Sequence, residues 1–531
     1  MQKIRNTLIR LFLSILSVLL LNLLNIGNFT LDDSYIGYKS ARNLALEGNL
    51  FSYSNLDQPT NIWTSPLLYM LATLIIFILT LVNYDTFTIY TFCILVVNML
   101  ATLNSCSSTK FIVEYLIRIP ETEQKRVKYG PSLKSILLFL FSCSPFLLAW
   151  LNGLETAITL SILLFVIRKI IEKDSTFLNL GLYALVLCRP EIGVCTLISV
   201  ILLRKRLFAN SYKFIIKICS VYCAPFVICK IITGSYFASS IIRVPLGTNT
   251  SIFEKVILLI KQLLHFPEYF IRFFIPSEGI YHYSNLFKTF LIVSVVLIWG
   301  YVLLNIVLKF KLRNSFKGIN LRLKKIFDDE VFSFIIVFLI SLTLALSASG
   351  SGIGENGRYF IYQFFLIIFV LIRFSFFSSV AISLLISANL LLLPATILEV
   401  LAINNFTNNV IKPLTKVVGE IGKPEDTLAL DSAGMLSLNF KGNVIDVYGL
   451  GTNRYAKIHG DFVEVYKTIN VDKPDFILAW ETTIPTYYLD SAHYLIAIKN
   501  AKILKIASYQ SFFLGRAIAP KMGLYRVEYL S

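Results

Sequence analysis

Apolar residues of this 531-residue chain are gathered in long runs that short polar segments separate. A bilayer core requires runs of about 17–25 apolar residues, so the pattern predicts an α-helical polytopic membrane protein. The first run, residues 7–26, follows Lys3 and Arg5 and has no small-residue cleavage site after it, so we expect an uncleaved anchor. The other expected spans, for about eleven crossings in all, are residues 87–105, 135–150, 155–171, 177–188, 191–203, 213–232, 287–308, 331–348, 359–376 and 379–400.

The run at residues 65–82 is apolar enough to cross as well, but the orientation of the chain argues against a crossing. If it crossed, the basic loop from Lys110 to Lys134 would lie outside, against the preference of basic loops for the cytoplasm. The conflict disappears if residues 65–82 form an interfacial or re-entrant hairpin on the outer face. We therefore expect the N-terminus and the basic loops inside, and the C-terminal region outside.

Two of the expected spans, 177–188 and 191–203, are short for a bilayer and are separated by Arg189-Pro190-Glu191. Charge and non-helical backbone at membrane depth are tolerated only where they line a cavity or are buried in protein. The pair therefore predicts a charged cleft open to the outer face. The outer loop 233–286 mixes charged residues with Leu, Ile and Phe, which is typical of amphipathic helices in the membrane interface.

From about residue 405 the content of charge, glycine and proline rises. Short strand-like runs appear at residues 427–430, 443–447, 475–480, 503–507 and 525–529, with a helix-like run at 461–470. We expect residues 405–531 to form a soluble extracytoplasmic α/β domain, after a transmembrane domain at 1–404 whose first outer loop is 27–86.

The net charge of +17 suggests nucleic acid at first sight, but the basic residues lie in loops between apolar runs, where they set orientation. A lipid bilayer, and no nucleic acid, is therefore the expected partner. None of the eight cysteines lies beyond Cys229, so the outer domain is expected to hold no disulfides. The four histidines lack the spacing of metal ligands and receive no role.

Four polar clusters are expected on the outer face, close to apolar runs: Asp32-Asp33 and residues 152–156, 189–191 and 354–359. Together they describe a cavity suited to an anionic head on a lipid. Arg189 and Arg358 are suited to clamp a phosphate, and a carboxylate is suited to take a proton from an attacking hydroxyl.

A structural alternative stays open for each cluster. Thr30-x-x-Asp33 fits a capping box, and Asn152-Gly153 fits a turn after which Glu155 begins a helix. Arg189 and Glu191 fit a local ion pair at a helix break, and the segment 354–357 fits a turn. Lys39 and Arg42 fit side chains that reach from the membrane interface to water.

The Asp32-Asp33-x-Tyr35-Ile36 opening, with Ala41-Arg42-Asn43-Leu44 and a glycine before an aromatic residue, resembles the first outer loop of GT-C glycosyltransferases. The closest likeness is to the bacterial branch that contains the mycobacterial terminal arabinofuranosyltransferase. Lys39 stands where an arginine often follows the motif. Further likenesses are Gly153-Leu154-Glu155-Thr156, Arg189-Pro190-Glu191, Arg358-Tyr359, Asp431-x-Ala433-Gly434 and Ile445-Asp446-x-x-Gly449-Leu450.

The resemblance implies a sugar transferase of the bacterial inner membrane. It would move a hexose or pentose from a polyprenyl-phosphate donor to a glycan or glycolipid acceptor of the cell envelope, such as lipopolysaccharide, on the extracytoplasmic face. Asp32 would act as base and Asp33 would orient it. Substrate would be bound by Tyr35, Lys39, Arg42, Glu155, Arg189, Glu191, Glu355, Arg358 and Tyr359.

Some GT-C enzymes use a divalent metal ion, Mg²⁺ or Mn²⁺, and others use none, so a metal at Asp32 and Asp33 stays open. Two other functions stay open as well: a transporter or flippase for a lipid-linked sugar, and a non-catalytic assembly subunit. Transporters usually show internal repeats and a substrate site at the membrane midplane. This chain has no repeat, and we expect its charged clusters at one face of the membrane.

Overall fold

The structure is a computed structural model, and it describes most of the membrane region and of the C-terminal region. The predicted outer loop 233–286, the span 287–308 and the basic loop 309–325 lie outside the described residues, apart from residues 233–236 and single positions. The described residues are 2–23, 32–51, 53, 65–81, 86–118, 132–142, 147, 155–207, 212–236, 329–349, 360–373, 379–430, 434–449, 451–458, 461–481, 498–511 and 521–530, with single positions between 257 and 304.

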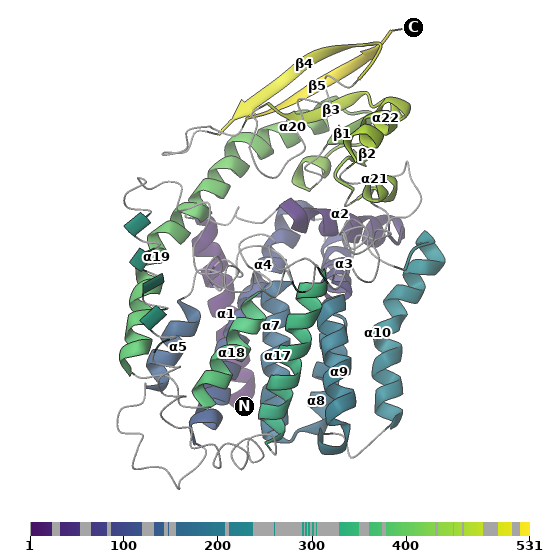
Figure 1. Ribbon diagram of the computed structural model, residues 1–531. Coiled ribbons are helices and arrows are strands. Elements are labelled where there is room, and N and C mark those ends of the chain that lie inside the picture. Colours follow the sequence, from purple (N-terminus) through teal and green to yellow (C-terminus); the bar gives the residue numbers. More distant parts are fainter. Residues whose placement is uncertain are drawn as a thin grey trace.

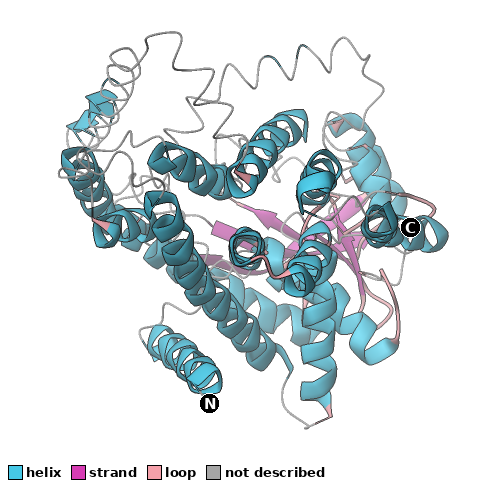
Figure 2. Ribbon diagram, turned by 90° about the horizontal axis from the view of Figure 1, so that it is seen from below, coloured by secondary structure: helices cyan, strands magenta, loops and turns pink. Residues whose placement is uncertain are grey.

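The chain is mostly helical, with apolar helices gathered in a bundle and a sheet domain at the end of the bundle away from the N-terminus (Figure 1). Seen from below, the bundle lies in front of the strands, and the N-terminal helix lies at its rim (Figure 2). The bundle helices are α1 (Gln2–Leu23), α4 (Thr86–Arg118), α5 (Leu133–Phe141), α7 (Thr156–Glu172), α8 (Ser175–Val186), α9 (Pro190–Leu207), α10 (Tyr212–Thr233), α17 (Glu330–Ser349), α18 (Ile361–Arg373) and α19 (Ser379–Phe406).

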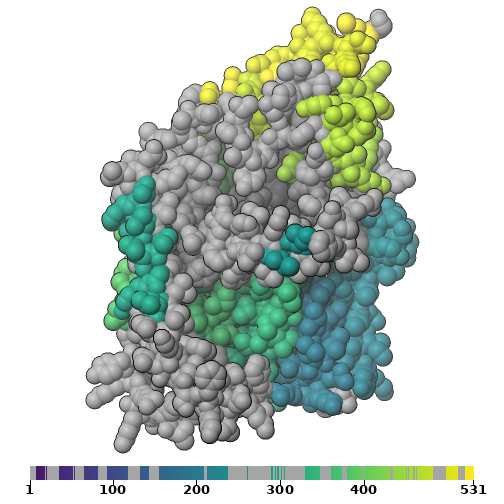
Figure 3. Space-filling view, viewed as in Figure 1, coloured from purple at the N-terminus to yellow at the C-terminus, as the bar shows by residue number. Residues whose placement is uncertain are grey.

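Three helices of the described part are long and apolar enough to cross a membrane: Phe92–Ile117, Tyr212–Thr233 and Val380–Ile421. Shorter apolar helices surround them. Helix α10, on the flank of the bundle (Figure 3), exposes Ile216 at 65% and Ile231 at 77% of their surface. A large exposed apolar face of this kind is costly in water and is stable against lipid.

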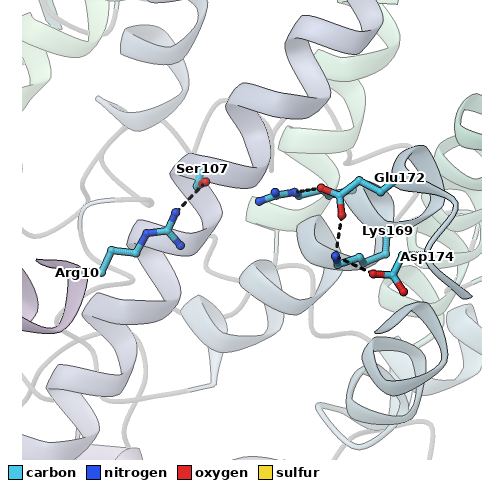
Figure 4. A network of polar contacts seen from close by, with 6 residues as sticks. Arg10, Ser107, Lys169, Glu172 and Asp174 are labelled. Atoms are coloured by element: carbon cyan, nitrogen blue, oxygen red, sulfur yellow. Dashed lines mark hydrogen bonds and ion pairs between the residues drawn. The ribbon is translucent and has the colours of Figure 1, made fainter. Parts of the chain in front are cut away.

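Helix α4 differs from the prediction, which ended this span at residue 105 and placed Lys110 and Arg118 in a loop. The helix continues to Arg118, and Lys110 lies on it as the partner of Glu114 one turn later. Neither glycine nor proline interrupts residues 86–118, whereas Pro120 follows two residues beyond the end. Arg10 of α1 donates to Ser107 of α4 at 3.0 Å (Figure 4).

Charged side chains close the end of the bundle that lies away from the sheet. The Lys169 ammonium contacts Glu172 at 2.6 Å and Asp174 at 3.2 Å, across the turn between α7 and α8 (Figure 4). Arg206, in the last turn of α9, donates to Ser333 in the first turn of α17 at 3.2 Å. These basic helix ends lie at the same end as the N-terminus, as the predicted orientation requires.

The C-terminal region forms a five-stranded sheet in the order β2-β1-β3-β5-β4. Strand β1 is parallel to β2 and β3, and β5 is antiparallel to β3 and β4, so the predicted α/β character is confirmed. The strands are β1 (Thr427–Leu430), β2 (Asn443–Asp446), β3 (Phe476–Trp480), β4 (Ala501–Gln510) and β5 (Lys521–Tyr529), with helices α21 (Asn453–Lys457) and α22 (Phe462–Asp472) between β2 and β3.

A continuous helical segment joins the membrane helices to this sheet. Helix α19 passes through a π-helical turn (Thr407–Ile411) into α20 (Lys412–Ile421), so the change of composition near residue 405 falls within a helix. The Phe406 ring stacks on Trp480 of β3, with ring centroids 5.3 Å apart. The end of the last membrane helix therefore packs directly on the sheet.

Side chains along each strand alternate between two cores. Leu428 and Leu430 of β1 point to one face of the sheet, whereas Ala429 points to the other face, where α22 packs. The first face is covered by α20 and by two helices of the first loop, α2 (Asp32–Glu47) and α3 (Pro66–Thr80). We call this apolar cluster of α2, α3, α20 and the sheet the shared core.

Helices α2 and α3 pack on each other in the first loop. Residues 65–82 are predicted to form a hairpin, but the structure has one helix there, α3. The helical pair of the first loop is instead formed by α2 and α3. Ser65 caps α3 by accepting from the Leu68 N–H, and Pro66 suits the first helical position, so the helix begins there. The hydroxyls of Ser40 and Tyr69 lie 2.8 Å apart between the two helices.

Asp446 holds the loop that follows β2. Its buried carboxylate accepts from the backbone N–H groups of Tyr448 at 2.9 Å, Gly449 at 3.2 Å and Gly451 at 2.6 Å. A Cβ at Gly451 would lie 2.4 Å from the Tyr53 ring, so the first loop packs tightly on this turn. The Asp446-x-x-Gly449 likeness noted in the sequence thus has a structural role.

Asp446→Asn is expected to destabilise the protein by about 2 kcal/mol, because the amide NH₂ of asparagine would face backbone N–H donors in a buried site. Thermal unfolding of the full chain in detergent measures the change. The control is Glu528→Gln, which replaces a carboxylate by an amide on the exposed side of β5 and should leave the unfolding midpoint unchanged. Equal midpoints for the two variants would contradict the role of the Asp446 loop.

Candidate active site at the break between α8 and α9

The predicted break between two short helices is present at Leu187-Cys188-Arg189, between α8 and α9. Pro190 disfavours helical backbone at the residue before it, and it suits the first position of α9. The Arg189 carbonyl accepts the first helical bond of α9, from the Gly193 N–H at 2.8 Å. The Leu187 carbonyl accepts from the Leu67 N–H of α3 at 3.0 Å, so the break lies against the first turn of α3.

Arg189 lies between two carboxylates in this break. Its Nη1 donates to Glu155 Oε1, and its Nε donates to Glu191 Oε1 at 2.5 Å. The three side chains are only 9%, 6% and 13% exposed. We call Glu155, Arg189 and Glu191 the charged triad; it joins the N-terminal ends of α7 and α9 although 34 residues separate its first two members.

Glu155 does more than begin a helix. It is the N-cap residue of α7, but its side chain makes no capping bond and reaches Arg189 instead. Glu191 lies in the first turn of α9. A carboxylate at a helix N-terminus is favoured by the partial positive charge there, which partly offsets the cost of burying these two.

Hydroxyl groups lie beside the triad on α7 and α18. The Tyr362 hydroxyl has Glu155 and Arg189 as electrostatic neighbours and lies next to Thr159. The buried hydroxyls of Thr156, Thr159 and Tyr362 reach hydrogen-bonding geometry with no described atom. Thr159 and Tyr362 are not among the predicted site residues, because the sequence marks them only as a hydroxyl near the start of an apolar run.

The charge of the triad bears on what it binds. The triad holds two carboxylates for one guanidinium, and a buried carboxylate is costly unless hydrogen-bond donors surround it. The predicted ion pair between Arg189 and Glu191 is present. An arrangement rich in acceptors and buried hydroxyls suits the hydroxyl groups of a sugar, whereas a phosphate needs further positive charge beside Arg189.

Arg189→Lys is expected to destabilise the protein by about 1–3 kcal/mol, because an ammonium cannot reproduce the hydrogen bonds that the guanidinium donates to both glutamates through Nε and Nη1. Thermal unfolding in detergent measures this. Arg168→Lys is the matched control: Arg168 pairs with Glu172 on the outside of α7 at 2.6 Å and is 30% exposed, so its replacement should cost under about 0.5 kcal/mol. A similar loss in both variants would argue against a special role for the triad.

Three other predicted site residues lie apart from the triad. Tyr35 is buried in the shared core, where its ring meets Tyr38 edge to face at 5.9 Å. Lys39 is 7% exposed; its Nζ donates to the Ser437 carbonyl at 3.1 Å and lies 4.7 Å from the centre of the Tyr53 ring. Arg42, one turn later, lines a cleft under the sheet domain.

The environment of Lys39 disfavours its charge. Burial, followed by the nearby Arg42, lowers the pKa of Lys39 to about 7, and Glu47 opposes the shift. Between about pH 7 and pH 10 the folded protein therefore binds fewer protons at this site than the unfolded chain, so the stability contributed here rises with pH across that window.

Lys39→Met keeps the aliphatic stem and removes the titrating group, so this rise should disappear. The difference in unfolding free energy between wild type and variant is expected to grow by roughly 2–3 kcal/mol from pH 7 to pH 9.5 in favour of the wild type. Thermal unfolding at both pH values measures it, with Lys502→Met on the exposed side of β4 as control. A difference that does not change with pH would contradict the burial of a neutral lysine.

The remaining predicted residues cannot be joined to this geometry. Asp32 and Asp33 form the first turn of α2, and their side chains lie outside the described residues, as do Glu355, Arg358 and Tyr359. Among the residues that the structure describes, no group of three or more His, Cys, Asp or Glu side chains is placed to hold a metal ion.

No protein-family model and no curated protein matches the chain. Among solved structures, it is similar to ArnT from Cupriavidus metallidurans bound to undecaprenyl phosphate, with a TM-score of 0.42 and 10% identity over 96% of this chain and 97% of that one. The apo structure of the same protein gives a TM-score of 0.41 and 9% identity over the same shares. TM-scores below 0.5 assign neither family nor activity, so the proposal below depends on the chain's own residues.

Proposed function

We propose that this protein is a membrane glycosyltransferase that moves a sugar from a polyprenyl-phosphate donor to a cell-envelope glycan or glycolipid. The observation that carries the proposal is the charged triad: buried carboxylates and an arginine at a helix break, within a bundle of apolar helices. Ionisable groups inside such a bundle are expensive, and they usually mark the place where a polar substrate is handled.

The Asp-bearing helix connects to the triad through α3. Helix α2, which begins with Asp32 and Asp33, packs on α3, and the first turn of α3 bonds to Leu187, two residues before Arg189. This supports a site shared by the first loop and the α8–α9 break. The apolar helices around it suit the prenyl chain of a donor that enters from the outer leaflet.

In the proposed reaction the acceptor hydroxyl gives its proton to a carboxylate of the Asp32-Asp33 pair, with Asp32 as the base. The acceptor oxygen forms a bond to the anomeric carbon, and the bond from that carbon to the phosphate oxygen breaks. The polyprenyl phosphate leaves with the electron pair of the broken bond. A base placed in this way typically contributes 10²–10⁴-fold to the rate.

We assign Glu155 and Glu191 to accept hydrogen bonds from sugar hydroxyls. They also hold the Arg189 guanidinium in place. Arg189, with Arg358 as the further cation, balances the charge of the leaving phosphate. Glu355 and Tyr359 neighbour Arg358 in the sequence and are assigned to the same site. The basic helix ends away from the sheet support a cytoplasmic side there, and so they support a reaction on the extracytoplasmic face of a bacterial inner membrane.

The identity of the sugar stays a prediction, including the arabinofuranosyltransferase likeness and a hexose or pentose as donor. A lipopolysaccharide acceptor is likewise a prediction. A divalent metal at the Asp pair is kept as a proposal that metal chelation would test.

The test uses the purified full chain in lipid nanodiscs with a panel of radiolabelled polyprenyl-phosphate sugars and envelope glycolipids. Wild type is expected to release polyprenyl phosphate and label the acceptor, Asp32→Asn to lose at least about 100-fold of that rate, and Arg189→Lys at least about tenfold. Arg168→Lys, outside the proposed site, should match the wild type.

Two outcomes would overturn the proposal. Transfer or slow donor hydrolysis that survives in a protein lacking both carboxylates would remove Asp32 and Asp33 from the chemistry. Movement of the intact donor between leaflets, without cleavage by the wild type, would identify a transporter instead.

A further inference from the structure

A cleft of 790 Å³ lies between α2 and the C-terminal region, apart from the charged triad. It has two walls that are far apart in the sequence: α2 with Tyr53 of the first loop on one side, and α20 with the segment from Met435 to Gly442 on the other. Ligand pockets commonly measure about 300–1,000 Å³, so this one has room for a short oligosaccharide. The sequence does not predict this cleft, because no single segment of the chain forms it.

The cleft is strongly basic. Arg42 of α2, Lys412 and Lys416 of α20, and Lys441 line it, and Glu47 is the one carboxylate among the lining residues. These groups sum to +3 without Lys39, whose buried Nζ donates to the Ser437 carbonyl. Polar side chains of Asn43, Thr415 and Asn439 lie among the cations and offer further hydrogen bonds.

The lysines of the cleft are placed to meet a ligand. Lys412, Lys416 and Lys441 are exposed, so the fold does not require their charges to be buried. The partner of Lys416 within the described part is Glu420, at the ion-pair limit of 4.0 Å and largely in water. Such an exposed pair contributes little and leaves the charge available to a ligand.

The position of the cleft argues for a water-soluble ligand group. Lys412 and Lys416 lie on α20, which follows the membrane helix α19 through the π-helical turn and packs under the sheet (Figure 1). Of this helical segment, the residues that line the cleft come from α20 and not from the apolar helix α19.

We infer that this cleft binds a phosphate- or carboxylate-bearing segment of the acceptor glycan and holds it beside the first loop. The assignment of the ligand as acceptor depends on the proposed function, whereas the binding of an anionic oligosaccharide depends only on the cleft. Because α2 forms one wall of the cleft and also begins with Asp32 and Asp33, a bound glycan would lie along the helix that carries the proposed base. Lys39 links that helix to the C-terminal region and keeps the two walls together.

The experiment measures binding of a fluorescent oligosaccharide that carries one terminal phosphate, compared with the same oligosaccharide without it. The full-length protein is held in nanodiscs of uncharged lipid. The triple variant Lys412→Gln, Lys416→Gln, Lys441→Gln should weaken binding of the phosphorylated probe at least tenfold, and binding to the wild type should weaken as salt increases, because the contacts are ionic. The unphosphorylated probe should bind at least tenfold more weakly than the phosphorylated one.

The matched control removes three exposed lysines of the same region outside the cleft, Lys457→Gln, Lys499→Gln and Lys502→Gln. Its net charge equals that of the test variant, so a change of less than twofold excludes a general charge effect. An equal loss in both triple variants, or no preference for the phosphorylated probe, would overturn the inference. Displacement of the probe by anionic phospholipid in the nanodisc would also overturn it, by showing that lipid phosphate reaches the cleft.

The two proposals fail in distinguishable ways. Binding of the phosphorylated probe by a wild type that transfers no sugar would keep the cleft and reject the glycosyltransferase. Sugar transfer to an anionic acceptor at the wild-type rate and KM by the cleft triple variant would keep the enzyme and reject the cleft as acceptor site. In the expected case the triple variant raises the KM for the acceptor and leaves the KM for the donor unchanged.

Discussion

The burial of one face of the C-terminal sheet against the first loop organises the half of the structure that contains the sheet. Leu428, Leu430 and Phe476 present an apolar surface that α20 covers only together with α2 and α3. Burying apolar area of this kind is the dominant favourable term in folding. The first loop and the C-terminal region, separated by more than three hundred residues of sequence, therefore share one core.

This shared core fixes the position of both proposed sites. It holds α3, whose first turn bonds to the end of α8 and so lies against the break that carries Arg189. It also holds α2, which forms one wall of the basic cleft. A change in the packing of α2 would thus reach the proposed base, the triad and the cleft together, since rigid packed elements transmit displacements.

The triad and the cleft differ in exposure and in the charged groups that they contain. The triad is buried, holds two carboxylates and one guanidinium, and lies among hydroxyl groups, which suits a neutral sugar. The cleft is open to water and carries surplus positive charge, which suits an anionic glycan. The basic cleft therefore suits the charged part of an anionic acceptor better than the carboxylate-rich triad does.

Local patterns in the sequence are enough to predict the apolar helices, the break at Arg189-Pro190 and the α/β character of residues 405–531, because periodicity and proline act locally. Only the tertiary structure decided that Arg189 bridges two glutamates from different helices, that Tyr362 and Thr159 lie beside them, and that Lys39 and Tyr35 belong under the sheet. Lys39 follows the Asp pair in sequence, so proximity along the chain suggested one site. Which face of a helix meets which partner depends on packing between distant segments, and no local pattern contains that information.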